Sequence, residues 1–438
     1  MKRHGNLWAE VVREANVHLA FAKAAAGKRD RAEVRRVTGE LDKALRRIAC
    51  DMAAGVFVFG HYRRFTIYEP KERIIHAARF EERVAHHALM NVCGPYLERR
   101  LTGDVFACRV GMGRTAAVVR AADFARRNRY FLKMDVRKYF DSIPHAGLAT
   151  LLGRVFRERP LLDCFGRIIR SHETASGRGL PIGSLTSQHL ANAYLGPVDR
   201  LVRSWPGIGG YVRYMDDMVA WSDGRETLVV LQRVVGETLV ALGLQFKPEP
   251  FRNRTAHGMD FLGCRIFSGR FEPNRATRVR WVRKMRRLDS ALAENAVSEM
   301  VFQRRATALC AHLDACSGAG FRRRILSTKL WSDATGLESG QPRRLVEQQC
   351  HQQPRGQPQQ EQPVEQEQQQ RVSPGPSTPL EARFARSEAV PASVPSRCES
   401  LGQTMRRPPG ASHCGANPAA NVPGGRSGIS HFLLGQFF

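Results

Sequence analysis

The chain has 438 residues, with 68 Lys and Arg against 41 Asp and Glu, and its formal net charge at pH 7 is +27. A surplus of this size favours nucleic acid as the partner, with an anionic membrane surface as the alternative. No stretch approaches about 20 apolar residues and no signal-peptide core is present, so we expect a cytoplasmic protein with no membrane partner. The 10 cysteines contain no Cys-x-x-Cys pair, which argues against a zinc site and predicts reduced thiols.

The first third of the chain is predicted to be mainly helical. Leu, Val and Ala recur among charged residues over 7–52, and a second helical pattern covers 83–101. Short β-like runs lie between them, at 56–59 and 65–67. The compact apolar run 130–135 then predicts a strand that ends on Asp135, a position where strands often carry functional groups.

The second half alternates predicted helices and strands. A long helix is expected over 187–202, entered through Pro181 and Gly183, and another over 226–242. Residues 211–221 are typical of a strand, a tight turn and a second strand. Further strands are predicted at 244–247 and 259–267, and the segment 275–330 is predicted to be helical and is densely basic.

The turn in 211–221 carries two adjacent acids, Asp216 and Asp217. Neighbouring carboxylates repel each other, and one is pushed towards protonation unless a cation lies between them. Mg²⁺ suits such a pair because it prefers carboxylate oxygen and leaves room for phosphate oxygens. Together with Asp135 the pair makes the triad that a two-metal phosphoryl-transfer site requires. The alternative is a solvated hairpin tip and a surface Asp.

Five motifs in chain order resemble the reverse transcriptase family. They are 131–135 with Tyr139 and Phe140, 179–184 with Ser187 and Gln188, 214–217, 242–247, and 261–263. Upstream, 71–75 with Arg83, and 109–114, are similar to the fingers motifs of that family. The resemblance covers about residues 60 to 330. It implies an α/β (α+β) right-hand polymerase with fingers, a palm whose antiparallel sheet carries the acids, and a helical thumb.

The domain boundaries follow from this resemblance. An N-terminal helical region is expected at 1–55, fingers and palm at 56–270, and a basic helical thumb at 271–335. The remainder, 336–438, is rich in Gln and Pro and predicts a disordered tail. We hypothesise that this tail is read out of frame from an overlapping template repeat, because CAA-CAA codons for Gln become AAC codons for Asn in the next frame. A plain Gln/Pro-rich tail is the alternative.

The resemblance also implies roles for site residues. Asp135 and Asp216 would be the principal ligands of two Mg²⁺ ions, with Mn²⁺ as an alternative, and Asp217 would complete the site. Lys247 would lie near the pyrophosphate as charge stabiliser or general acid. Phe140 would sit beneath the incoming sugar and exclude a 2′-hydroxyl; an ordinary core aromatic is the alternative.

Other residues are expected to hold the nucleotide and the duplex. Arg109 and Arg114 flank a Gly-containing turn and are predicted to clamp the triphosphate, with ordinary exposed arginines as the alternative. Residues of the basic run 275–287 are predicted to contact the template–primer backbone, with a solvated basic face as the alternative for any one of them. Trp281 within this run is predicted to pack in the core, with a position against the duplex as the alternative. The backbone-binding set is Arg278, Arg283, Lys284 and Arg287.

The nucleotide-pocket motif departs from the general family pattern. Most reverse transcriptases carry Gln-Gly before Ser-Pro, whereas this chain has Ile182-Gly183-Ser184 and, further on, Ser187-Gln188. Loss of a polar amide is expected to reduce selectivity. The variant resembles the enzymes of diversity-generating retroelements, which make error-prone cDNA from a template-repeat RNA and work with deoxynucleoside triphosphates and a small basic accessory protein. A group II intron or retron-type reverse transcriptase is the alternative, and a non-catalytic RNA-binding protein on the same fold is a third reading.

Overall fold

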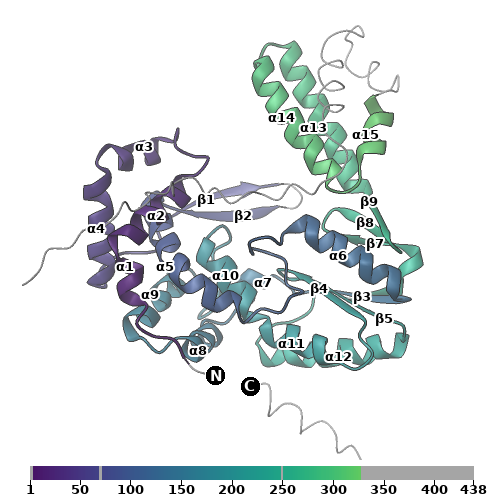
Figure 1. Ribbon diagram of the computed structural model, residues 1–438, viewed down its shortest axis with the longest axis horizontal. Coiled ribbons are helices and arrows are strands. Elements are labelled where there is room, and N and C mark those ends of the chain that lie inside the picture. The colour runs from purple at the N-terminus through teal and green to yellow at the C-terminus, as the bar shows by residue number, and fades with distance from the viewer. Residues whose placement is uncertain (1–2, 69–71, 248–249, 327–438) are drawn as a thin grey trace, which may run out of the picture. The chain divides into compact units, whose positions relative to one another are not determined.

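The computed structural model describes residues 3–68, 72–247 and 250–326, which form a mixed α/β fold with antiparallel sheets (Figure 1). The predicted fold class is confirmed in this part of the chain. The predicted tail at 336–438, and the end of the predicted thumb at 327–335, lie outside the described residues.

The N-terminal region is helical, as predicted. Helix α4 shows why, because Leu45, Ile48, Ala49 and Met52 recur at helical spacing and are all buried. Helix α2 packs against the long helix α5, so the N-terminal region shares its core with the following segment. The bounds are α1 Trp8–Val12, α2 Glu14–Ala25, α3 Ala32–Gly39, α4 Leu41–Ala53 and α5 Phe80–Glu98.

A two-stranded hairpin separates these helices, formed by β1 (Tyr62–Ile67) and β2 (Arg73–Ala78). Residues 56–59, predicted to be β-like, are not in a strand, and β2 was not predicted. Glu82 explains the local geometry: its buried carboxylate accepts backbone N–H bonds from Gly60 and His61, both at 2.9 Å. The chain is thereby turned just before β1 begins.

The central sheet has four antiparallel strands in the order β4-β5-β3-β6. The strand–turn–strand prediction is confirmed by β4 (Gly210–Tyr214) and β5 (Asp217–Ser222), and the strand prediction for 130–135 by β3 (Tyr130–Asp135). The edge strand β6 (Phe251–Arg254) was not predicted.

Helices cover both faces of this sheet (Figure 1). Phe131, Val219 and Trp221 point to one face, where they join the core formed with α6 (Arg114–Arg127). Their neighbours Leu132 and Met218 point to the other face and pack into the core shared with α12 (Arg225–Ala241). This alternation buries both faces and leaves the turn between β4 and β5 at one end of the sheet.

The prediction of a single helix over 187–202 is wrong. The chain forms two helices, α10 (Leu185–Tyr194) and α11 (Gly196–Ser204), because Pro197 has no N–H to continue the first helix and occupies the first turn of the second. Three further helices complete this side: α7 Tyr139–Ser142, α8 His145–Val155 and α9 Arg159–Arg170.

The predicted strand at 259–267 is in fact a hairpin. Leu262 and Gly263 both have positive φ, 48° and 80°, and so turn β7 (Met259–Phe261) back into β8 (Cys264–Phe267). A third strand, β9 (Arg270–Pro273), completes this small sheet. The predicted strand at 244–247 makes only an isolated bridge, between Phe246 and Val136. The short 3₁₀ turn η1 (Thr255–His257) precedes β7.

The basic C-terminal segment forms the three helices α13 (Arg275–Ala293), α14 (Glu299–Asp314) and α15 (Ala319–Leu326). Asn274 caps α13 by accepting the Thr277 N–H at 2.9 Å. The apolar faces form a separate core that includes Trp281, Met285 and Phe302, so the prediction that Trp281 packs inward is confirmed.

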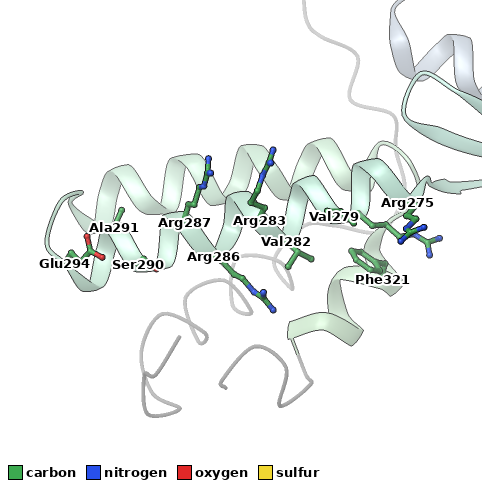
Figure 2. Close-up of a pocket in the computed structure, with 11 residues that line it drawn as sticks. Arg275, Val279, Val282, Arg283, Arg286, Arg287, Ser290, Ala291, Glu294 and Phe321 are labelled. Atoms are coloured by element: carbon green, nitrogen blue, oxygen red, sulfur yellow. The ribbon is translucent and has the colours of Figure 1, made fainter. Parts of the chain in front are cut away.

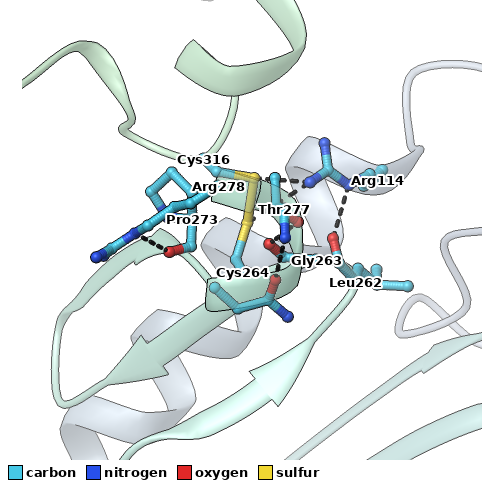
Figure 3. The surroundings of a disulfide bond; sticks show 9 residues. Arg114, Leu262, Gly263, Cys264, Pro273, Thr277, Arg278 and Cys316 are labelled. Atoms are coloured by element: carbon cyan, nitrogen blue, oxygen red, sulfur yellow. Dashed lines mark hydrogen bonds between the residues drawn. A yellow bond between two sulfur atoms is a disulfide. The ribbon is translucent and has the colours of Figure 1, made fainter. Parts of the chain in front are cut away.

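A disulfide joins Cys264 of β8 to Cys316, just after α14, with their Cα atoms 5.9 Å apart (Figure 3). Arg114 lies beside it, donating from Nη2 to Cys316 Sγ at 2.7 Å and from Nε to the Leu262 carbonyl at 2.7 Å. The expectation of reduced thiols is wrong for this pair. Cysteines 52 residues apart show no pairing in their spacing, because only the folded chain brings them together.

Candidate active site

Three acidic side chains gather where β3 ends and β5 begins. The antiparallel register places Asp135 directly opposite Asp217, so both side chains point to the same face of the sheet. Asp216 precedes Asp217 in the turn that joins β4 to β5. The structure therefore brings together the three acids that the sequence singled out.

The turn itself is held in an uncommon backbone conformation. Met215 has φ of 56°, in the left-handed region that non-glycine residues seldom occupy. The Arg213 guanidinium donates to the Met215 carbonyl at 3.0 Å. Strain of this kind persists only where surrounding contacts fix it, which is common at functional sites.

The two acids of the turn have raised pKa values. Burial raises the pKa of Asp217 to about 6; Lys133 opposes this shift, and Asp135 and Asp216 add to it. Burial is also the main cause of the raised pKa of Asp216, followed by the nearby Asp135 carboxylate, while Arg73 acts in the opposite direction. Repulsion between the acids is thus part of both shifts, as expected for carboxylates crowded into one site.

Two lysines partly balance this negative charge. Lys247 Nζ lies 3.3 Å from Asp135 Oδ2, and the Lys247 backbone N–H donates to the Asp135 carbonyl at 2.8 Å. Lys133 Nζ lies 3.4 Å from Asp217 Oδ2 and donates to the Asp260 carbonyl at 2.8 Å. Lys247 is therefore beside the acids, where the sequence placed it.

The predicted nucleotide-pocket segment is fixed to the β1–β2 hairpin. The Ile182 carbonyl accepts the His76 N–H at 2.8 Å, and Gly183 has φ of 110°. A Cβ at Gly183 would come within 2.9 Å of Ile75 Cγ2, so both the backbone angle and the space require glycine. Ser184 follows, and its Oγ lies 2.9 Å from Nδ1 of the buried His86.

Two other predicted pocket residues lie on the elements around the acids. Phe140, on α7, is partly buried and packs edge-on against Tyr139 with ring centroids 5.8 Å apart. The Tyr139 hydroxyl donates to the Ala191 carbonyl of α10 at 2.5 Å. Gln188 on α10 accepts from the Cys108 thiol at 3.5 Å.

Both predicted triphosphate-clamping arginines make structural contacts. Arg109 is only 14% exposed and donates to the Glu98 carboxylate at 3.0 Å and to the Thr102 and Val105 carbonyls. Arg114 is bound at the disulfide, as described above. These bonds occupy the guanidinium groups, and the clamping role of both residues stays a prediction.

The basic helix α13 borders a groove of about 720 Å³ (Figure 2). Arg283 and Arg287 project from the same side of the helix, one turn apart, and apolar side chains form part of the lining. Of the four predicted backbone-binding residues, Lys284 does not line it. The lining includes Arg275, Arg278, Val279, Val282, Arg283, Arg286, Arg287 and Phe321.

Comparison with known families decides the class of this fold. Residues 71–266, which include every acid and lysine of the site described above, match the family model described as reverse transcriptase (RNA-dependent DNA polymerase). The chain contains a reverse transcriptase domain. The match includes the antiparallel sheet with its acids and ends before α13, and the assignment of a palm and a thumb stays a prediction.

Similarity of the reverse transcriptase domain to individual proteins is distant. The chain is 22% identical over 154 residues to the COX1/OXI3 intron 2 protein of Saccharomyces cerevisiae, a match that covers 33% of this chain and only 17% of that protein. Apo telomerase from Candida tropicalis aligns with a TM-score of 0.39 and 10% identity, over 50% of this chain and 49% of that one. A form of that telomerase truncated from its C-terminal domain gives 0.39 and 12%, over 49% and 55%. Nothing further is inferred from these structural likenesses.

The donor set of the reverse transcriptase domain fits Mg²⁺. Oδ1 of Asp217 is buried and has no hydrogen-bond partner among the described residues, so an oxygen ligand is available there. Within the same residues, no three His, Cys, Asp or Glu side chains form a ready metal cage. Mg²⁺ does not need one, because it is usually held by one or two carboxylates together with substrate phosphates and water.

Three charged residues of the site were not selected from the sequence. Lys133 could have been found from strand periodicity, since it lies two residues before Asp135 on the same face of β3. Arg213 stands out as a charge within an otherwise apolar strand. Arg73 was noted only as part of a motif, and its effect on Asp216 depends on the folded hairpin.

No helix in the described part of the chain is long and apolar enough to cross a membrane.

Proposed function

We propose that this protein is an RNA-directed DNA polymerase that makes error-prone cDNA from a template-repeat RNA, as part of a diversity-generating retroelement. The observation that carries the polymerase activity is the register that sets Asp135 opposite Asp217, beside Asp216 and next to Lys247. The error-prone character rests on Ile182 in the pocket segment, where a hydrogen-bonding amide is absent.

In the proposed reaction, the primer 3′-oxygen forms a bond to the α-phosphorus of a deoxynucleoside triphosphate. The bond from that phosphorus to the pyrophosphate oxygen breaks, and the 3′-hydroxyl gives its proton to water. Asp135 and Asp216 would hold two Mg²⁺ ions, or Mn²⁺ in their place, with Asp217 completing the site. When bound, these ions lower the pKa of the attacking hydroxyl and neutralise the leaving pyrophosphate. Lys247, already beside Asp135, would stabilise or protonate that leaving group.

Phe140, Ile182, Gly183 and Gln188 would bound the incoming nucleotide. The ring of Phe140 supplies bulk that a 2′-hydroxyl would meet. Gly183 keeps the segment close against β2, so Ile182 is presented on a fixed backbone. An aliphatic side chain there tolerates mispaired geometry that a matched polar group would reject.

Template RNA and cDNA would lie against the groove of α13, with Arg278, Arg283 and Arg287 close to the phosphates and Lys284 nearby on the same helix. The arginine-lined groove supports backbone contacts that do not depend on sequence. A small basic accessory protein is the further partner we propose, by analogy with the retroelement enzymes that this chain resembles.

A group II intron or retron-type reverse transcriptase is the second candidate. One observation favours it, namely the match to a yeast protein described as an intron 2 protein. The match covers 17% of that protein, so it bears on the polymerase segment that the two candidates share. Error spectra separate them, because only the first candidate requires frequent misincorporation opposite template adenine.

The test copies an adenine-containing RNA with the full chain and sequences the cDNA. The wild type should misincorporate opposite adenine more often than opposite other bases. The Ile182→Gln protein should reduce this error by up to about tenfold, the size of one net hydrogen bond. Ile182→Leu, which keeps the side chain aliphatic, is the matched control and should retain the wild-type spectrum. A wild type with no excess of errors opposite adenine would exclude the error-prone reading while leaving polymerase activity intact, and an identical spectrum for all three proteins would exclude the role of Ile182.

A further inference from the structure

Arg213 is an arginine near the end of β4, an edge strand of the central sheet, and has no exposed surface. It lies in β4, two residues before Met215, and points to the face covered by α10 and α11. Its partner is Asp199 of α11, also 0% exposed, with Nε–Oδ1 and Nη2–Oδ2 distances of 2.6 Å each. This side-on pair matches the geometry in which a guanidinium binds a carboxylate through two parallel bonds.

Every N–H of this guanidinium is used. Arginine carries five donors in a planar fork. Two bind Asp199, as above; Nη1 donates to Asn192 Oδ1 at 3.0 Å, and Nη2 to the Asn192 carbonyl at 2.8 Å. The fifth donates from Nη1 to the Met215 carbonyl at 3.0 Å. Complete satisfaction is what a buried cation requires, and it leaves the side chain a single orientation.

The guanidinium of Arg213 joins two parts of the candidate site, namely the acidic turn between β4 and β5 and the helix α10. Met215 is the left-handed residue of the acidic turn. Asn192 belongs to α10, the helix that starts at the nucleotide-pocket segment and carries Gln188. Asn192 is itself held by donating to the Ala107 carbonyl at 2.6 Å. One guanidinium therefore spans from the turn that bears Asp216 to the helix behind the incoming nucleotide.

We propose that Arg213 is a positioning residue, whose guanidinium holds the Met215 carbonyl and so fixes Asp216 and Asp217 relative to α10. The inference rests on the proposed polymerase function, and it adds a residue that touches neither metal nor nucleotide. A buried guanidinium needs all five donors satisfied, but stability alone does not require the fifth acceptor to be the carbonyl of a strained turn. The bond to the Met215 carbonyl is therefore the feature that points to positioning.

Lysine cannot replace this residue. An ammonium has three donors on one nitrogen and cannot reach Asp199, Asn192 and Met215 in the directions that the planar fork covers. Arg213→Lys keeps the positive charge but removes the planar arrangement of hydrogen-bond donors. Tyr211→Phe is the matched control, because the Tyr211 hydroxyl donates to the same Asp199 oxygen at 3.0 Å from the same strand but makes no bond to the turn.

The experiment measures three quantities on the full-length proteins: kcat and KM for RNA-templated nucleotide addition, the affinity for Mn²⁺ by electron paramagnetic resonance, and the thermal midpoint. Arg213→Lys should lower kcat by about 100-fold with little change in KM, as expected when reacting groups shift by about 1 Å. It should also weaken Mn²⁺ binding by at least about tenfold, the usual effect of losing a group that orients ligands. Tyr211→Phe should keep wild-type kcat and Mn²⁺ affinity.

The outcomes separate this inference from the proposed function. A wild-type protein with no polymerase activity overturns the proposed function, and the Mn²⁺ comparison still tests Arg213. Wild-type Mn²⁺ affinity in folded Arg213→Lys, or losses that Tyr211→Phe shows equally, would overturn the positioning role. If Arg213→Lys does not fold, Asn192→Ser replaces it, since this change removes one bond from the nitrogen that holds Met215. The same two effects, each several-fold, are then expected, and their absence overturns the proposal.

Discussion

The tip of the central sheet and the helix α13 hold their charges in different ways. At the sheet, Asp135 faces Lys247, Asp217 faces Lys133, and the buried Arg213 is paired with Asp199. Along α13, several arginines line one side of a groove of about 720 Å³ together with apolar side chains. The first region contains a few charges in fixed pairs, whereas the second is a row of mainly like charges, of which Arg278 is paired with Glu272 at 3.0 Å.

This difference follows from what each region is proposed to bind. Nucleotidyl transfer requires reacting atoms to be placed closely, so the charges around them must be fixed before substrate arrives. A duplex backbone repeats its phosphates, and a row of arginines suits it without a unique contact. Changes at the sheet should therefore alter turnover, and changes on α13 should alter affinity and its dependence on salt.

The largest effect is expected from Asp216→Asn. Removing one proposed metal ligand should lower kcat by about 1,000-fold, because the lost stabilisation amounts to several kcal/mol and each 1.36 kcal/mol is a factor of ten. Binding of the template–primer, measured by fluorescence anisotropy, should change little. Asp163→Asn, at a 68% exposed acid of α9, is the control and should match wild type. If Asp216→Asn and Asp163→Asn had the same kcat, the claim that changes at the tip of the sheet alter turnover would be contradicted.

Reducing the disulfide tests the link between the small sheet β7–β9 and the segment that follows α14. Cys264 and Cys316 close a loop across 52 residues of sequence, and the entropy of such a loop in the unfolded chain is worth about 4 kcal/mol. A reductant should lower the unfolding midpoint of wild type but not of Cys316→Ser. Cys50→Ser, which removes an exposed thiol, serves as the control and should respond like wild type. If reductant leaves the unfolding midpoint of the wild type unchanged, the disulfide contributes nothing to stability.

Asp217 makes a prediction about pH. Its folded-state pKa is about 6 against an ordinary 3.8, so between these values the folded state binds the proton more tightly than the unfolded state. The free energy of unfolding should therefore fall as pH rises from 4 to 6 through this group. Without divalent cations, Asp217→Asn should be more stable than wild type by at most about 3 kcal/mol above pH 6, and equal to it below pH 4. Urea titrations across this range measure the difference; a gain largest at low pH would contradict the assignment.

The smallest effects are expected on α13. Arg283→Gln and Arg287→Gln should each weaken template–primer binding and reduce the slope of log affinity against log salt by about 1, with kcat at saturating duplex unchanged. Arg159→Gln, at a 92% exposed arginine of α9, is the control and should leave the slope as in wild type. A fall in kcat without any change in the salt slope would place α13 with the catalytic region instead.

Local patterns were enough to predict the strands and the turn that bring the three acids together. The apolar run of β3 ending at Asp135, and the aromatic-flanked turn at Asp216 and Asp217, are each contained in about ten residues. Strand alternation and turn chemistry determine such elements. The break between α10 and α11 also had a local cause, Pro197, and was missed because the apolar pattern continues across it.

Contacts between distant segments could not be predicted in this way. The pairing of Cys264 with Cys316 and the bonds that Arg213 makes to Asn192 join residues from separate elements. Their sequence spacing carries no information on distance in the folded chain. Arg109 illustrates the converse, because its motif suggested a phosphate contact, whereas the fold surrounds it with Glu98 and two carbonyls.

Primer extension on an RNA template tests the central claim most directly. The full-length protein, given a DNA primer, deoxynucleoside triphosphates and Mg²⁺, should make DNA complementary to the RNA. A chelator should abolish the product, added Mg²⁺ should restore it, and Asp135→Asn should lack it. Absence of extension by wild type, or equal extension by Asp135→Asn, would contradict the claim that the acids at the end of β3 and the start of β5 form the polymerase centre.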